Sequence, residues 1–127
     1  MKWNWIDQRV LLLLHDESLA DHGGVSGLRD EGLLESALAR PANLAAHEKP
    51  DAAALAASYA VALAKKHAFV DGNKRVGFLA MGLFLFQNGY RLTASQADAT
   101  VTMLAVAAGE IDEGALAKWM RGNLVKR

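Results

Sequence analysis

The chain has 127 residues, 52% of them hydrophobic and 22% charged, which is typical of one globular domain with a single core, spanning residues 1–127. Fourteen Lys and Arg residues balance 14 Asp and Glu residues, so no net charge attracts nucleic acid or an anionic membrane as a direct partner. The absence of cysteine excludes disulfides, thiolate catalysis and cysteine-based zinc sites, and is compatible with the reducing cytoplasm, where we expect the protein.

Hydrophobic spacing and capping residues predict helices in the first half of the chain. Apolar side chains at helical spacing predict a first helix from residue 6 to about 20, and two glycines end it. Asp30 is placed to cap a second helix, and Pro41 marks its predicted end. Residues 41–50 contain both prolines and lack a clean period, so we expect an exposed connection there.

The second half continues the helical pattern. Asp51 opens an alanine-rich helix to about residue 66, and Asn73 opens the most apolar helix of the chain. Because residues 76–86 are apolar on every side, this helix is predicted to be central. Two more helices are predicted over residues 95–108 and 112–122, and no alternating strand pattern appears. The fold class is therefore all-α, a compact single-domain bundle of about six helices around a central apolar helix.

The segment from His67 to Arg75 gathers the residue types of a phosphate site. The first backbone N–H groups of the helix that Asn73 opens have no partners inside the helix, and the helix dipole adds positive charge there. Gly72 allows the backbone to approach a phosphate, and Lys74 and Arg75 add fixed charge. Asn73 itself can cap the helix, contact phosphate, or do both.

Three further residues of the segment have candidate roles. Asp71 would repel a phosphate unless Mg²⁺ lay between them, so it is the candidate metal ligand, with helix capping as the alternative. His67 is the candidate general base, with a histidine that merely ends the preceding helix as the alternative. Phe69 is interpreted as a structural anchor of the loop, packed into the core.

A second group of polar residues has a simpler interpretation. His15, Asp16 and His22 fall on the first helix, where they suggest a metal site. Since no further ligand follows at suitable spacing, we interpret them as a polar helix end.

The segment resembles the core motif of the Fic/Doc family, which runs His-x-Phe-x-(Asp/Glu)-Gly-Asn-x-Arg. The matching residues are His67, Phe69, Asp71, Gly72, Asn73 and Arg75. Similarity to the death-on-curing (Doc) toxin branch extends to residues 14–16, 23–24, 27–30, 34–41 and 88–90. The resemblance implies an all-helical fold in which the motif loop leads into a central helix.

The resemblance also implies an activity. In the AMP-transferring branch the histidine is the base, the acidic residue holds Mg²⁺ and a Gly-Asn-Gly-Arg stretch cradles phosphates. This chain has Lys74 where that branch has its second glycine, and Phe78 where it has a second arginine. Lysine adds bulk and charge inside the cradle, so a nucleotide cannot lie there in the same way.

The Doc branch, with Asn-Lys-Arg at these positions, resembles a kinase of the Ser/Thr type, with ATP and Mg²⁺ as cofactors. Its family activity is transfer of the γ-phosphate of ATP to a threonine of elongation factor Tu, which stops translation and growth. His67 would then deprotonate the hydroxyl, Asp71 would hold Mg²⁺, and Lys74 and Arg75 would stabilise the transferring phosphate. Some Doc members carry alanine where this chain has Gly72, which keeps AMP transfer to a protein hydroxyl open as an alternative.

A partner follows from the resemblance as well. The pattern of a built-in inhibitory helix, Ser/Thr-x-x-x-Glu-Gly/Asn, is absent, because Ser26 and Glu31 are one residue too far apart. We therefore expect control by a small cognate antitoxin whose disordered C-terminal segment folds on the toxin. A third hypothesis is a non-catalytic toxin that acts by binding the ribosome or the antitoxin.

Overall fold

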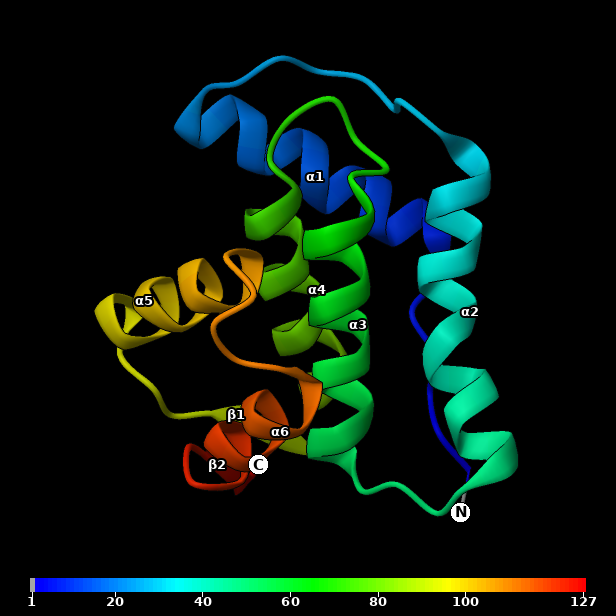
Figure 1. Cartoon of the computed structure of the whole chain (residues 1–127), viewed down its shortest axis with the longest axis vertical. Coiled ribbons are helices and arrows are strands. Elements are labelled where there is room, and N and C mark those ends of the chain that lie inside the picture. The colour runs from blue at the N-terminus through cyan, green and yellow to red at the C-terminus, as the bar shows by residue number, and fades with distance from the viewer. Residues whose placement is uncertain (1) are drawn as a thin grey trace.

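The computed structural model describes residues 2–127, which form six helices and one two-stranded sheet (Figure 1). In chain order the elements are α1 (Gln8–His22), α2 (Glu31–His47), α3 (Ala52–Lys66), α4 (Asn73–Gln87), β1 (Tyr90–Leu92), α5 (Gln96–Ala107), α6 (Glu113–Arg121) and β2 (Leu124–Lys126). The prediction of an all-α bundle is confirmed. None of the helices in this part of the chain is both long enough and apolar enough to cross a membrane.

Side-chain caps explain where most of the helices begin. Five helices start after an aspartate or serine whose side chain accepts a hydrogen bond from a backbone N–H of the first turn. These residues are Asp7, Asp30, Asp51, Ser95 and Asp112. The exception is α4, which Gly72 precedes with no side-chain cap. Among the six helices of residues 2–127, the start that lacks a side-chain cap is therefore the one that the motif predicts to bind an anion.

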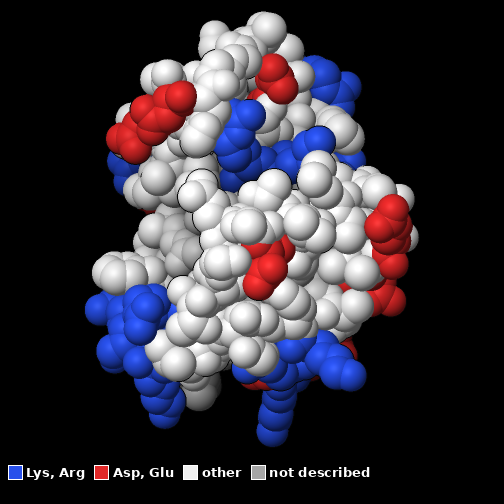
Figure 2. Space-filling view, turned by 90° about the vertical axis from the view of Figure 1, so that its left-hand side faces the viewer, with Lys and Arg blue, Asp and Glu red and all other residues white. Residues whose placement is uncertain are grey.

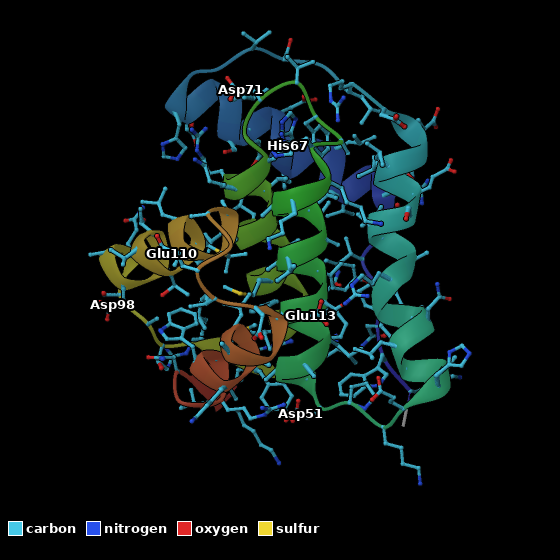
Figure 3. The ribbon with its side chains drawn as sticks, in the orientation of Figure 1. Asp51, His67, Asp71, Asp98, Glu110 and Glu113 are labelled. Carbon is cyan, nitrogen blue, oxygen red and sulfur yellow. The ribbon has the colours of Figure 1, made fainter. Side chains whose placement is uncertain are left out.

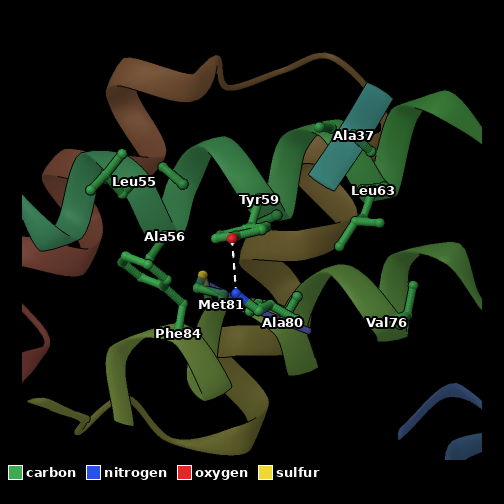
Figure 4. Close-up of a cluster of buried hydrophobic side chains, with 14 of the residues drawn as sticks. Ala37, Leu55, Ala56, Tyr59, Leu63, Val76, Ala80, Met81 and Phe84 are labelled. Carbon is green, nitrogen blue, oxygen red and sulfur yellow. Dashed lines mark hydrogen bonds between the residues drawn. The ribbon is translucent and has the colours of Figure 1, made fainter. Parts of the chain in front are cut away.

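The centre of the bundle is shared by α3 and α4. Most residues of α3 are buried, whereas α4 leaves Phe86 55% exposed near its end. Figure 4 shows Tyr59 of α3 lying among apolar side chains of both helices, where its hydroxyl accepts a hydrogen bond from the Ile6 backbone N–H at 3.1 Å. The predicted central apolar helix is thus one of a central pair, and α4 packs against the largely buried α3.

The predicted end of the second helix at Pro41 is wrong. α2 continues through Pro41 to His47, so most of the expected connection over residues 41–50 is helical. Proline removes one backbone hydrogen bond, but Pro41 is itself buried, and Leu44 beyond it packs against the core. Burial of Pro41 and the packing of Leu44 offset the lost hydrogen bond.

The small sheet was not predicted. β1 pairs antiparallel with β2, with Arg91 opposite Val125 at the centre of the register. Each strand has three residues, which is too short for an alternating pattern to be recognised. The sheet joins the segment after α4 to the C-terminal segment, at the end of the bundle opposite the His67 loop (Figure 1).

Candidate active site

The motif loop, residues 67–72, connects α3 to α4 at one end of the bundle (Figure 3). His67 ends α3 with φ 52° and ψ 48°, the one non-glycine residue with a positive φ in the described chain. Its carbonyl oxygen accepts a hydrogen bond from Arg29 Nε at 2.7 Å, while its imidazole is exposed and has no hydrogen-bond partner among residues 2–127. The backbone of the candidate base is held, and its ring is available to a substrate.

The α1–α2 loop, residues 23–30, pairs with the motif loop. The backbone N–H of Arg29 donates to the Ala68 carbonyl at 2.8 Å, and that of Val70 donates to the Gly27 carbonyl at 3.0 Å. Figure 1 shows the α1–α2 loop passing over the motif loop on its way to α2. Two segments that are far apart in sequence therefore form one small unit of backbone hydrogen bonds.

Two backbone N–H groups hold the side chain of Asp71 in its carboxylate form. Its Oδ2 accepts a hydrogen bond from the Val25 backbone N–H at 3.1 Å, and its Oδ1 accepts one from the Gly72 N–H at 2.8 Å. These two hydrogen bonds, with Arg75 nearby, lower the pKa of Asp71 below its ordinary value. The α1–α2 loop approaches closely at Gly24, where a Cβ would lie 2.9 Å from Oδ2. Asp71 is therefore ionised throughout the neutral pH range.

His15 is a residue of the site that sequence reasoning missed. It is only 2% exposed, its ring stacks on Phe69 with 3.8 Å between centroids, and its Nε2 lies 2.8 Å from the Asp71 carbonyl oxygen. The interpretation as part of a polar helix end is therefore wrong for His15. The available signal was its spacing, because it stands four residues after Leu11 and four before Leu19 on the buried face of α1.

Asn73 and Phe69 close the loop on itself. The Asn73 side chain accepts a hydrogen bond from the Phe69 N–H at 3.1 Å and donates one to the Phe69 carbonyl at 3.0 Å. Both residues are buried, with Phe69 part of the hydrophobic core. Because the amide side chain of Asn73 is occupied in this way, its remaining group for a phosphate is the backbone N–H.

The start of α4 is open to an anion. The backbone N–H groups of Asn73, Lys74 and Arg75 have no hydrogen-bond partner within residues 2–127, as expected for an uncapped first turn. Lys74 is exposed, and the Arg75 guanidinium lies 3.5 Å from the Gly23 carbonyl oxygen. Figure 2 shows basic side chains gathered along a hollow on this face of the molecule. Partial charges of the helix and full charges of two side chains thus act at one point.

A cleft of about 970 Å³ lies beside this helix start, between α1, the motif loop, α4 and α5. Its polar lining includes His67, Asp71, Lys74 and Arg75 from the motif segment, and α1 adds Glu17, Ser18, Asp21 and His22. The rest of the lining is mostly apolar and includes Phe78, Leu79, Ala99, Met103 and Leu104. A charged part joined to an apolar wall suits a ligand with phosphates at one end and an aromatic base at the other.

The side chains of the site can hold Mg²⁺ only together with oxygen atoms of a bound ligand. Asp71 supplies one ionised carboxylate, and no group of three or more His, Asp or Glu side chains within residues 2–127 converges to hold a metal. Mg²⁺ is commonly held by one or two carboxylates together with substrate phosphates. The site thus suits an ion that arrives with a nucleotide.

Comparison with known proteins matches residues 5–85 to the Fic/DOC family, a segment that contains the whole motif loop. The chain is similar to a protein named Protein kinase doc from Escherichia phage P1, with 36% identity over 117 residues, which cover 91% of this chain and 92% of the relative. It is also similar to a protein named Toxin Doc from Mycolicibacterium smegmatis, with 42% identity over 74 residues, or 57% of each chain.

Proposed function

The chain belongs to the Fic/DOC family, and from this premise we propose that it is a Doc-type toxin that transfers the γ-phosphate of ATP to a Ser or Thr hydroxyl of a protein. The observation that carries the proposal is the uncapped start of α4. There, open backbone N–H groups and two cationic side chains lie beside the ionised Asp71. An anion that binds together with a divalent cation fits this site, because the anion suits the cationic helix start and the cation suits the Asp71 carboxylate.

The side chains divide the phosphoryl transfer between them. His67, whose ring has no partner in the described chain, takes the proton of the acceptor hydroxyl as that oxygen attacks the γ-phosphorus. The bond from the γ-phosphorus to its bridging oxygen breaks, and ADP leaves. Lys74 and Arg75 stabilise the negative charge of the transferring group. Mg²⁺ held by Asp71 and the phosphates would neutralise further charge.

The lining of the cleft favours phosphate transfer over AMP transfer. Phe78 stands one helical turn beyond Lys74 and lines the cleft with an apolar ring. The cations on α4 in the cleft are therefore confined to its first turn, which suits contact with the terminal phosphates of a nucleotide. The name of the phage relative, Protein kinase doc, supports the same choice.

AMP transfer is the second candidate, and Gly72 favours it. Gly72 has φ 77°, a conformation in which glycine is the least strained residue. Glycine at this point of the motif is shared with the AMP-transferring branch of the family. The two reactions differ in which phosphorus is attacked, so they can be separated directly.

We further propose that the acceptor is elongation factor Tu in the cytoplasm, so that the modification stops translation and growth. A cognate antitoxin with a disordered C-terminal segment would hold the toxin inactive. The names of both relatives support a toxin of this kind, since one is called a toxin and the other a kinase. A toxin that acts by binding alone is the remaining alternative.

Differential labelling tests the proposal. The purified protein is incubated with purified elongation factor Tu and Mg²⁺, using ATP labelled at either the α or the γ phosphate. We expect label from the γ position alone, and strongly reduced labelling with His67→Asn or Asp71→Asn. Label from the α position alone would contradict the kinase proposal and would show that the protein is an AMP transferase. Growth arrest by both variants at unchanged protein levels would instead support a toxin that acts by binding.

A further inference from the structure

We propose that His15 is a positioning residue, which orients the peptide between Asp71 and Gly72 and through it the Asp71 carboxylate. His15 comes from the middle of α1, 56 residues before Asp71 in sequence. Its Nε2 lies 2.8 Å from the Asp71 carbonyl oxygen. Because a carbonyl oxygen can only accept, the Nε2 atom carries the proton and donates it.

The geometry of a trans peptide carries the effect onward. In a trans peptide, the C=O bond of one residue and the N–H bond of the next residue lie in one plane and point in opposite directions. When His15 holds the Asp71 carbonyl toward α1, the Gly72 N–H is directed away from α1. That N–H donates to Asp71 Oδ1 at 2.8 Å. A buried side chain on α1 therefore sets the direction of a hydrogen bond to the exposed carboxylate.

The opposite side of the carboxylate is fixed independently. Asp71 Oδ2 accepts from the Val25 N–H at 3.1 Å, so the two oxygens are held by donors from different segments. α1 thus supports Asp71 twice, through His15 in its middle and through the loop that follows its end. Residues that hydrogen-bond to a metal ligand and orient it commonly matter in this way: their removal lowers metal affinity or activity by about 10 to 100-fold.

Packing alone does not account for a histidine at position 15. The ring stacks on Phe69, a contact that phenylalanine would make equally well. A buried imidazole must have its N–H satisfied, and here the acceptor is the carbonyl directly before the start of α4. The donor and the ring can therefore be tested separately.

The test uses two substitutions and a control. His15→Phe keeps an aromatic ring without the donor, and His15→Gln keeps a donor at a similar distance from the backbone without the ring. Leu11→Ala creates a cavity on the same face of α1 and controls for general loss of stability, since Leu11 is fully buried. If His15→Phe does not fold, His15→Leu provides the donor-free variant.

Three quantities are measured on each protein: amide hydrogen exchange of Gly72 and Val25 by NMR, affinity for Mg²⁺ with a non-hydrolysable ATP analogue, and the rate of γ-phosphate transfer. In His15→Phe we expect the Gly72 amide to exchange about tenfold faster, as for loss of one hydrogen bond. We expect Mg²⁺ affinity and transfer to fall by about 10 to 100-fold. His15→Gln should restore most of each.

The catalytic part of this inference rests on the proposed function, whereas the exchange measurement does not. Wild-type exchange and Mg²⁺ affinity in His15→Phe would overturn the positioning role, as would equal losses in His15→Phe, His15→Gln and Leu11→Ala. A wild-type protein that transfers no phosphate, with Gly72 exchange still separating the Phe from the Gln variant, would overturn the proposed function and leave the positioning role intact.

Discussion

The guanidinium of Arg29 reaches from the α1–α2 loop to the end of α3, where Nε lies 2.7 Å from the His67 carbonyl oxygen and Nη2 lies 3.4 Å from that of Lys66. These carbonyls belong to the last turn of the helix, which has no internal donors for them. Arg29 therefore stabilises the left-handed backbone at His67 and fixes the direction in which the imidazole leaves the chain.

Arg29→Ala should lower kcat for phosphate transfer about tenfold, since a charge-assisted hydrogen bond to the backbone of the base is lost. The KM for ATP should change little, because Arg29 is not part of the cleft lining. The matched control is Arg9→Ala, which removes an exposed arginine at the start of α1. Equal kcat values for Arg29→Ala and the wild type would contradict this role.

His67→Asn separates the chemistry of the base from the shape of the loop. Asparagine tolerates the left-handed conformation of His67, so the fold and thermal stability should be close to those of the wild type. The transfer rate should fall by about 10² to 10⁴-fold, the usual contribution of a general base. Thermal unfolding and single-turnover transfer of labelled γ-phosphate measure the two effects. A rate within threefold or so of the wild type would remove His67 from the mechanism.

Local signals explain why much of the fold could be predicted. An aspartate or serine before an apolar period marks a helix start by a hydrogen bond two or three residues away, so Asp30 and Asp51 were recognisable from sequence. The open start of α4 was recognisable by a different local argument, because the first backbone N–H groups of a helix have no partners inside it. The groups that we propose bind an anion there are its own backbone N–H groups and the adjacent Lys74 and Arg75, which all lie within one turn.

Features that depend on distant segments were not predictable in this way. The residues near Pro41 do not indicate that packing against the core keeps α2 helical beyond the proline. The residues near Tyr90 do not indicate that this segment pairs with a strand near the C-terminus. His15 is the instructive case, because it was interpreted together with Asp16 and His22, which are exposed, as a polar helix end. Its role depends on a carbonyl 56 residues away, which the sequence of α1 does not contain.

The ion pair between Asp51 and Arg121 predicts a pH-dependent stability. Arg121 donates to both carboxylate oxygens, at 2.7 and 3.0 Å, and this lowers the pKa of Asp51 below its ordinary value of 3.8. A lowered pKa in the folded state adds stability above the unfolded-state value, and this stability is lost as pH falls through the folded-state value. The joined α3 and α6 ends should therefore loosen in acid.

Asp51→Asn tests this directly, because asparagine keeps the cap of α3 and removes the charge. Near pH 7 the variant should be less stable by about 0.5 kcal/mol, a small value because both side chains are half exposed. The difference should vanish as pH falls below about 3 in urea unfolding series. A difference that stays constant down to that pH would show that the charge of Asp51 is not its source.

Alanine substitutions at two glycines of α4 are expected to change the stability of the protein in opposite directions. A Cβ at Gly77 would lie 2.9 Å from the Ala60 carbonyl oxygen of α3, whereas a Cβ at Gly82 would meet nothing within 4 Å. Gly77→Ala should therefore destabilise by about 1 to 3 kcal/mol, since two backbones must separate. Gly82→Ala should stabilise by about 0.5 to 1 kcal/mol, because alanine loses less entropy in a helix. Urea unfolding of both variants compares them in one helix, and destabilisation of equal size would mean that close approach of α3 and α4 is not what position 77 requires.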